Sequence, residues 1–107
     1  MSKPEVVFAL YRPHAGKAEA LETILARHVP VLRELGLVTE RPVVLARAAD
    51  GTYFEVFEWR DAEAAEQAHD LPAVAEIWDA IGEVADFKTL ADLDEARRPF
   101  PHFRTVR

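Results

Sequence analysis

The sequence predicts an α+β domain in which an antiparallel four-stranded sheet carries two helices on one face. Short apolar runs at residues 5–12, 42–49 and 52–60 have the alternation of strands. Stretches with helical spacing follow the first and the third of these runs. Asp50-Gly51, between the second and third runs, is the strongest short hairpin signal, because Gly accepts the positive φ that tight turns require.

The length of 107 residues suits a single domain, residues 1–107, with a core at about 5–95 and an arm at 96–107. Half of the residues are apolar and 30% are charged, an ordinary balance for a globular protein. No run approaches the roughly 18 apolar residues of a membrane span. The first residues show no export signal. We therefore expect a cytoplasmic protein with no membrane partner.

The residue types that are missing exclude several chemistries. There is no Cys, which removes disulfides, thiolate catalysis and cysteine-bound zinc. Ser2 is the only serine, so a serine-dependent acyl transfer has no nucleophile. The net charge is −6 and the basic residues form no large cluster, so nucleic acid is not an expected partner. The four glycines are far apart, which argues against a nucleotide-binding loop.

The first strand, residues 5–12, is apolar on both faces, which is typical of a sheet covered on both sides. A helix is expected at residues 17–35, with an apolar stripe that includes His28. Gly36 is a suitable left-handed cap for it. Pro30 removes a backbone donor inside this helix, so a kink is expected next to His28.

The hairpin is expected to pair Ala49 with Thr52. This register places Glu55 and Glu58 on opposite faces of an otherwise apolar sheet, with the small Ala46 and Ala48 beside Glu55. Either acid could then face the helices. The other would face outward, and the sequence does not choose between them.

The second helical region is predicted in two parts. Asp61 is a suitable N-cap, and Pro72 interrupts or restarts the helix. The following residues 87–93 could be strand or helix, and strand is the prediction. The arm at 96–107 has apolar residues between prolines, which favours an extended segment packed on a surface.

The element order β-α-β-β-α-β is that of ferredoxin-like domains, in which both helices cover the same face. The other face is also apolar and needs cover. A homodimer with its sheets packed face to face provides it, and the arm is a candidate for reaching across to the partner.

The layout, the segment GLVTERPVVLARAADGTYFEVFEW and the segment AHDLPAVAEIWDAI resemble the antibiotic biosynthesis monooxygenase-like domains of the dimeric α/β-barrel superfamily. This resemblance covers about residues 5–95. It implies a pocket for a small apolar or aromatic ligand between sheet and helices. Known members include cofactor-independent oxygenases of quinols or phenols and haem-degrading enzymes. The haem-degrading members use an Asn-Trp-His set, which this chain cannot form because it has no Asn.

The candidate catalytic residues are His28, Glu55 and His69, any of which could act as a base. Each has a structural alternative, such as a buried histidine that only completes its hydrogen bonds. The candidate substrate-binding residues, which could equally be core or dimer packing, are Trp78, Trp59, Tyr53 and Glu58.

Three functions remain open from the sequence. The first is a cofactor-independent monooxygenase-like enzyme acting on an aromatic or quinol-like compound. The second is a non-catalytic domain that binds a small ligand or dimerises. The third is a metal-assisted enzyme using His28, Glu55 and His69, although no close pair of histidines marks a metal site. No metal or cofactor is part of the preferred prediction.

Overall fold

A computed structural model describes residues 3–107 of the chain. Its elements, in chain order, are β1 (Glu5–Pro13), α1 (Ala18–Glu34), β2 (Val44–Arg47), β3 (Tyr53–Trp59), α2 (Ala62–Ala68), α3 (Pro72–Val84), β4 (Ala85–Lys88), the 3₁₀ helices η1 (Leu90–Asp92) and η2 (Asp94–Arg97), and β5 (Arg104–Thr105). The predicted α+β, ferredoxin-like order is confirmed. No helix of residues 3–107 is long and apolar enough to cross a membrane.

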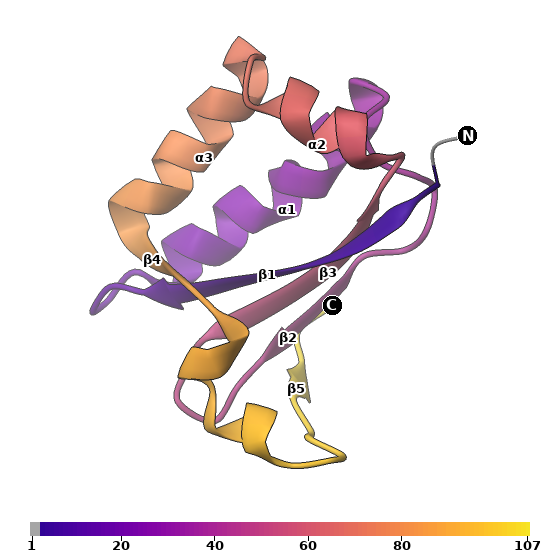
Figure 1. Cartoon of the computed structure of the whole chain (residues 1–107). Helices are drawn as coiled ribbons and strands as arrows, with labels where there is room; N and C mark the ends of the chain where they lie inside the picture. The colour runs from indigo at the N-terminus through magenta and orange to yellow at the C-terminus, as the bar shows by residue number, and fades with distance from the viewer. Residues whose placement is uncertain (1–2) are drawn as a thin grey trace.

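The strands form one antiparallel sheet in the order β4-β1-β3-β2-β5. The helices α1, α2 and α3 lie together on one face of this sheet, and none of them lies on the opposite face (Figure 1). The short β5 was not expected from the sequence. It pairs with the outer edge of β2 at Ala46 and Arg47.

The helix ends follow the local sequence signals. Gly36 has φ of +74°, and the amides of Gly36 and Leu37 donate to the carbonyls of Arg33 and Leu32, which closes α1 with a Schellman motif. The Asp61 carboxylate accepts from the Ala64 amide at the start of α2. Pro72 begins α3 after a short break, so the predicted two-part helix is confirmed.

The hairpin register differs by one residue from the expected one. Ala48 hydrogen-bonds to both Gly51 and Thr52, so the loop has three residues and Gly51 takes a φ of +96°. Leu45 therefore lies opposite Glu55. A shift of one residue moves every side chain of a strand to the other face. Ala46 and Ala48 thus lie on the outer face, away from Glu55, and the expectation that they make room for this acid was wrong.

The last part of the chain packs on the outer face of its own sheet. The strand expected at 87–93 ends at Lys88, because Thr89 and Asp92 form a capping box that starts η1. Phe103 then stacks on Phe54, with ring centroids 4.9 Å apart. The arm, a candidate for reaching across to a partner, lies against β2 in this chain (Figure 1).

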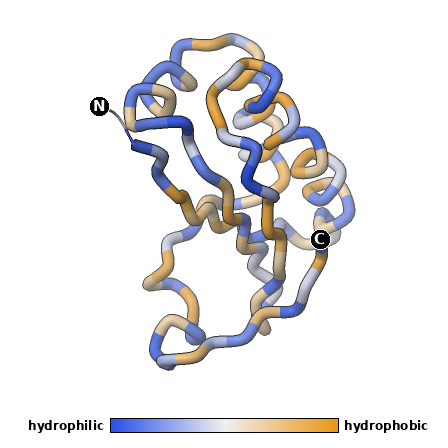
Figure 2. Tube along the Cα trace, turned by 90° about the vertical axis from the view of Figure 1, so that its right-hand side faces the viewer, coloured by the Kyte–Doolittle hydropathy of each residue, from blue (hydrophilic) through white to orange (hydrophobic). Residues whose placement is uncertain are grey.

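The part of the outer face that the C-terminal segment does not cover is apolar and exposed to solvent. We call this the outer patch; its side chains come from alternate positions of β1, β2 and β3, namely Val6, Phe8, Val44, Phe54 and Val56. Val6, Phe8 and Val44 are each half exposed, at 54%, 51% and 50%. Apolar residues run along the strands in the middle of the molecule (Figure 2).

Candidate functional site

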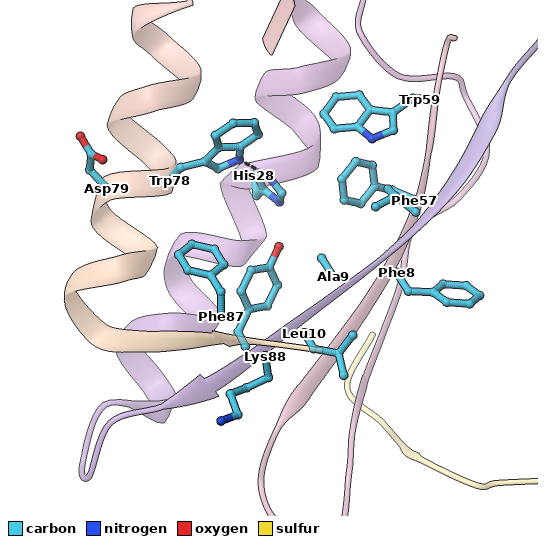
Figure 3. Close-up of a pocket in the computed structure, with 12 residues that line it drawn as sticks. Phe8, Ala9, Leu10, His28, Phe57, Trp59, Trp78, Asp79, Phe87 and Lys88 are labelled. Carbon is cyan, nitrogen blue, oxygen red and sulfur yellow. Dashed lines mark hydrogen bonds between the residues drawn. The ribbon is translucent and has the colours of Figure 1, made fainter. Parts of the chain in front are cut away.

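A cavity of about 460 Å³ opens between the sheet and α3, beside the part of β1 that β4 does not cover. Its lining is mainly apolar and aromatic: Val7, Phe8, Ala9, Leu10, Tyr11, His28, Phe57, Trp59, Trp78, Asp79, Phe87 and Lys88. The volume is in the range of small-molecule sites. Figure 3 shows Trp78 and His28 meeting at its wall, whereas Phe8 points to the other side of the sheet. This is the candidate ligand site.

A chain of hydrogen bonds crosses the wall of this cavity from α3 through α1 to the sheet. The Trp78 indole Nε1 donates to His28 Nε2 at 3.0 Å. On the other side of the ring, His28 Nδ1 lies 3.0 Å from Glu55 Oε1. Tyr11 donates its hydroxyl to the same oxygen at 2.8 Å. His28 and Glu55, proposed from the sequence, are therefore in direct contact.

The partners of His28 define its proton arrangement. An indole N–H can only donate, so Nε2 of His28 must accept. The ring proton then sits on Nδ1 and is donated to Glu55, as assigned from the hydrogen-bond network. A neutral imidazole held by a carboxylate at Nδ1, with a lone pair on Nε2, is the arrangement of a general base. In this structure Trp78 occupies that lone pair.

The local packing explains how these groups come together. Leu21, Leu25, His28 and Leu32 lie on the buried stripe of α1 that faces the sheet. Ala9 is directly opposite Glu55 in the β1–β3 pair, and its small side chain leaves room for the carboxylate. His28 and Glu55 are almost completely buried, at 2% and 1% exposure. Buried polar groups need partners, and these two supply one another.

Tyr11 is a member of this network that the sequence reasoning did not single out. It lies diagonally from Glu55 across the β1–β3 pair, a position from which long side chains can interact. Alternation along β1 together with the pairing to β3 was the signal that could have found it. Burial, together with the adjacent Glu55 carboxylate, raises the pKa of Tyr11 well above its usual value, so the hydroxyl stays a donor.

The other residues proposed from the sequence lie in three settings. Trp59 and Trp78 line the cavity. Tyr53 is buried on the helix side, where its hydroxyl donates to Glu22 and Arg47 lies over its ring. Glu58 points to the outer face, where it accepts from Thr39 and Arg41. Tyr53 and Glu58 do not line the cavity. Of the two acids between which the sequence could not choose, Glu55 is the one that faces the helices.

His69 is exposed and does not join His28 and Glu55. Its ring packs edge-on against Trp78, with centroids 5.0 Å apart. Residues 3–107 contain no group of three or more His, Asp or Glu side chains placed to hold a metal ion. The proposed His28, Glu55 and His69 metal site is therefore not formed, because His69, the C-cap of α2, lies exposed on the surface.

Comparison with known proteins gives matches only at the level of structure. No family model matches the sequence. No curated protein matches it either.

Three solved structures superpose on most of the chain. The cofactor-independent oxygenase SnoaB from Streptomyces nogalater, solved as a point mutant, has a TM-score of 0.69 and 17% identity over 81% of this chain and 88% of its own. A putative antibiotic biosynthesis monooxygenase from Chloroflexus aurantiacus has a TM-score of 0.62 and 18% identity over 87% of each chain. The chain has the fold of antibiotic biosynthesis monooxygenase-like domains. The resemblance expected from the sequence is thus confirmed for the fold.

The third structure shows that this fold is not limited to one reaction. It is tetracenomycin F2 cyclase from Streptomyces glaucescens, a type-II polyketide cyclase, with a TM-score of 0.55 and 24% identity over 83% of this chain and 89% of its own. A shared fold does not specify a shared reaction, so the function of this chain has to be argued from its own site.

Proposed function

We propose that the protein is an enzyme that binds an aromatic, phenolic or quinol-like compound in the large cavity and uses His28 as a base. The observation that carries this proposal is the hydrogen-bonded order Trp78, His28, Glu55 in the wall of an aromatic cavity. Glu55 orients the imidazole so that Nε2 is the basic atom. Because the wall around Nε2 is apolar, water competes little with a bound phenol for this nitrogen.

The reaction class that we propose is cofactor-independent monooxygenation. A phenol hydroxyl that replaces the Trp78 N–H at His28 Nε2 can lose its proton to this atom, and the resulting phenolate is rich in electrons. The phenolate is the reductant for molecular oxygen. One oxygen atom enters the ring as a carbonyl oxygen, and the ring C–H and O–H hydrogens leave with the second atom as water. The product is a quinone.

Structural neighbours with two different reactions define the main alternative. The same base could instead remove a proton next to a carbonyl and promote a cyclisation, the type of reaction for which the Streptomyces glaucescens neighbour is named. Cyclisation consumes no oxygen. A non-catalytic ligand-binding role predicts binding without any turnover.

Oxygen uptake with a panel of naphthols, naphthoquinols and anthrones tests this proposal directly. We expect oxygen consumption matched by quinone formation in the wild-type protein and its loss in His28→Ala. Binding of the probes without oxygen uptake or any other turnover would favour the ligand-binding role. The matched variant His14→Ala changes an exposed histidine paired with Asp86 and should retain activity.

We further propose that two copies associate through the outer patch. Val6, Phe8 and Val44 are half exposed there, next to the partly buried Phe54 and Val56. A contiguous apolar surface of this kind on a sheet is typical of an interface. A second copy of the chain offers a surface of the same chemistry, as a two-fold interface requires.

A further inference from the structure

A second, smaller hollow reaches Glu55 from the side of α1 and β2. This slot has a volume of about 90 Å³ and is lined by Leu25, Ala26, Val29, Pro30, Arg33, Val43, Leu45, Glu55 and Arg107. Glu55 lines the slot, whereas His28 lines the large cavity. The hydrogen-bonded pair of Glu55 and His28 therefore connects two separate hollows.

The free oxygen of Glu55 indicates that solvent reaches it through the slot. Both hydrogen bonds of the carboxylate are accepted by Oε1. In the described part of the chain, every side-chain oxygen or nitrogen that is fully buried from solvent has a hydrogen-bond partner. Because neither of these two hydrogen bonds reaches Oε2, this atom is not fully buried. Only 2% of the Glu55 side chain is exposed, which means that the opening to Oε2 is narrow.

Ala26 provides a second polar group beside the same slot, its backbone carbonyl. Proline has no N–H, so the carbonyl of Ala26, four residues earlier in α1, has no α-helical donor from position 30. Ala26 and Pro30 both line the slot. Water occupies about 30 Å³ in the liquid and needs two to four polar partners, so the slot has room for up to about three molecules between this carbonyl and Glu55.

Two arginines line the slot together with the carboxylate. The guanidinium of Arg33 donates to the carbonyls of Thr39 and Arg41. Arg107 is tied to Leu45, the residue opposite Glu55, by two backbone hydrogen bonds of 2.9 Å. The guanidinium of Arg107, which donates to the carbonyl of Glu22, adds a positive charge at the slot that attracts the carboxylate.

We propose that the slot is a water-filled route by which Glu55 exchanges protons with solvent while a ligand fills the large cavity. This inference rests on the proposed function for the source of the proton, which is the hydroxyl group of the bound phenol. The phenol O–H breaks as a bond forms to His28 Nε2; the Nδ1–H bond breaks as a proton passes to Glu55. Rotation of the Glu55 carboxyl group then turns this proton from Oε1 toward the slot, where it passes to water, and hydronium leaves to solvent. The phenolate remains bound against Nε2–H; after it has reacted with oxygen, a proton that returns by the same route completes the water product and restores the starting state of His28.

A high-resolution crystal structure of the protein without added ligand tests the first part of this proposal. We expect an ordered water within hydrogen-bonding distance of both Glu55 Oε2 and the Ala26 carbonyl. Pro30→Ala returns a backbone donor to that carbonyl, and we expect the water there to be lost or displaced. A slot without water in the wild-type protein would overturn the proposal, whatever the enzyme does with phenols.

Proton exchange of the His28 ring tests the route itself without any substrate. Ala26 is exposed on α1 and lines the slot, so Ala26→Phe covers the slot. We expect exchange of the Nδ1 proton with solvent, measured by NMR, to slow by about tenfold, the effect of about 1.4 kcal/mol on a barrier. Arg27→Phe, at the neighbouring exposed position outside the slot, should leave the rate unchanged. Equal exchange rates in the two variants would reject the route.

Discussion

Trp78 and His28 are joined by a hydrogen bond between α3 and α1, with the indole Nε1 3.0 Å from the imidazole Nε2. This contact occupies the only lone pair of a neutral imidazole whose other nitrogen is held by Glu55. The indole therefore keeps His28, the proposed base, ordered but covered. A ligand hydroxyl has to exchange with the indole N–H to reach it.

Removal of the indole donor should weaken the protein while leaving the cavity in place. Trp78→Phe keeps an aromatic ring but leaves His28 Nε2 without its partner. We expect a loss of about 1–3 kcal/mol in the free energy of unfolding, measured by urea denaturation, which is the cost of a buried acceptor left unpaired. Trp59→Phe is the matched control, because it shortens another indole of the same cavity that is not bonded to His28. An equal loss in both variants would mean that ring size, not the hydrogen bond, matters.

The two tyrosines should titrate unusually late. Burial and the Glu55 carboxylate raise the pKa of Tyr11 well above its usual value, and burial with the hydrogen bond to Glu22 raises the pKa of Tyr53 to about 12. The chain has no other tyrosine. The tyrosinate absorbance of the folded protein should therefore stay low as pH passes 10, whereas the urea-unfolded protein should titrate near 10.

The sign of the linked stability change follows from these raised values. Each hydroxyl is more easily ionised in the unfolded chain, so its contribution to stability is complete below pH 10 and is lost as pH rises through the folded pKa. Tyr11→Phe should leave a single transition near 12, that of Tyr53. A folded protein whose absorbance rises fully near pH 10 would contradict the buried setting of both groups.

The sequence predicted the helices and strands better than it predicted the side-chain contacts between them. Alternation, helical spacing, Asp61 and Pro72 are local signals, and the order of strands and helices follows from them. Hairpin register depends on whether the loop has two or three residues, and Asp50-Gly51 fits both. Because the expected register differed by one residue, Ala46 and Ala48 were assigned to the wrong face of the sheet.

The site required contacts that no local pattern contains. His28 and Glu55 could be proposed because each is a polar residue on an apolar face. Tyr11 was missed because its role depends on the β1–β3 register, and His69 was included because its place at the surface depends on where α2 ends. The final strand was missed because β5 has only two residues and owes its pairing to the edge of β2.

The outer patch should control association of two copies. Phe8→Glu puts a charge on a half-exposed position of β1 that faces away from the helices, so the fold should persist while the dimer dissociates. Sedimentation equilibrium measures the change. Leu35→Glu is the control, because Leu35 is also exposed but follows α1 on the opposite layer. A monomeric wild-type protein, or a Phe8→Glu variant that remains dimeric, would exclude this interface.

Glu55 and Glu58 give the sharpest test of the site, because they are three residues apart on one strand and face opposite ways. Glu55→Gln removes a buried charge that holds Tyr11 and His28, and it should cost about 1.5–3 kcal/mol of unfolding free energy and abolish turnover. Glu58→Gln weakens a pair with the exposed Arg41 and should cost less than about 1 kcal/mol, with turnover kept. Urea denaturation and oxygen uptake of both variants measure the two effects. Retained turnover in Glu55→Gln would show that His28 works without its carboxylate. Loss of turnover only in Glu58→Gln would move the active site to the outer face of the sheet.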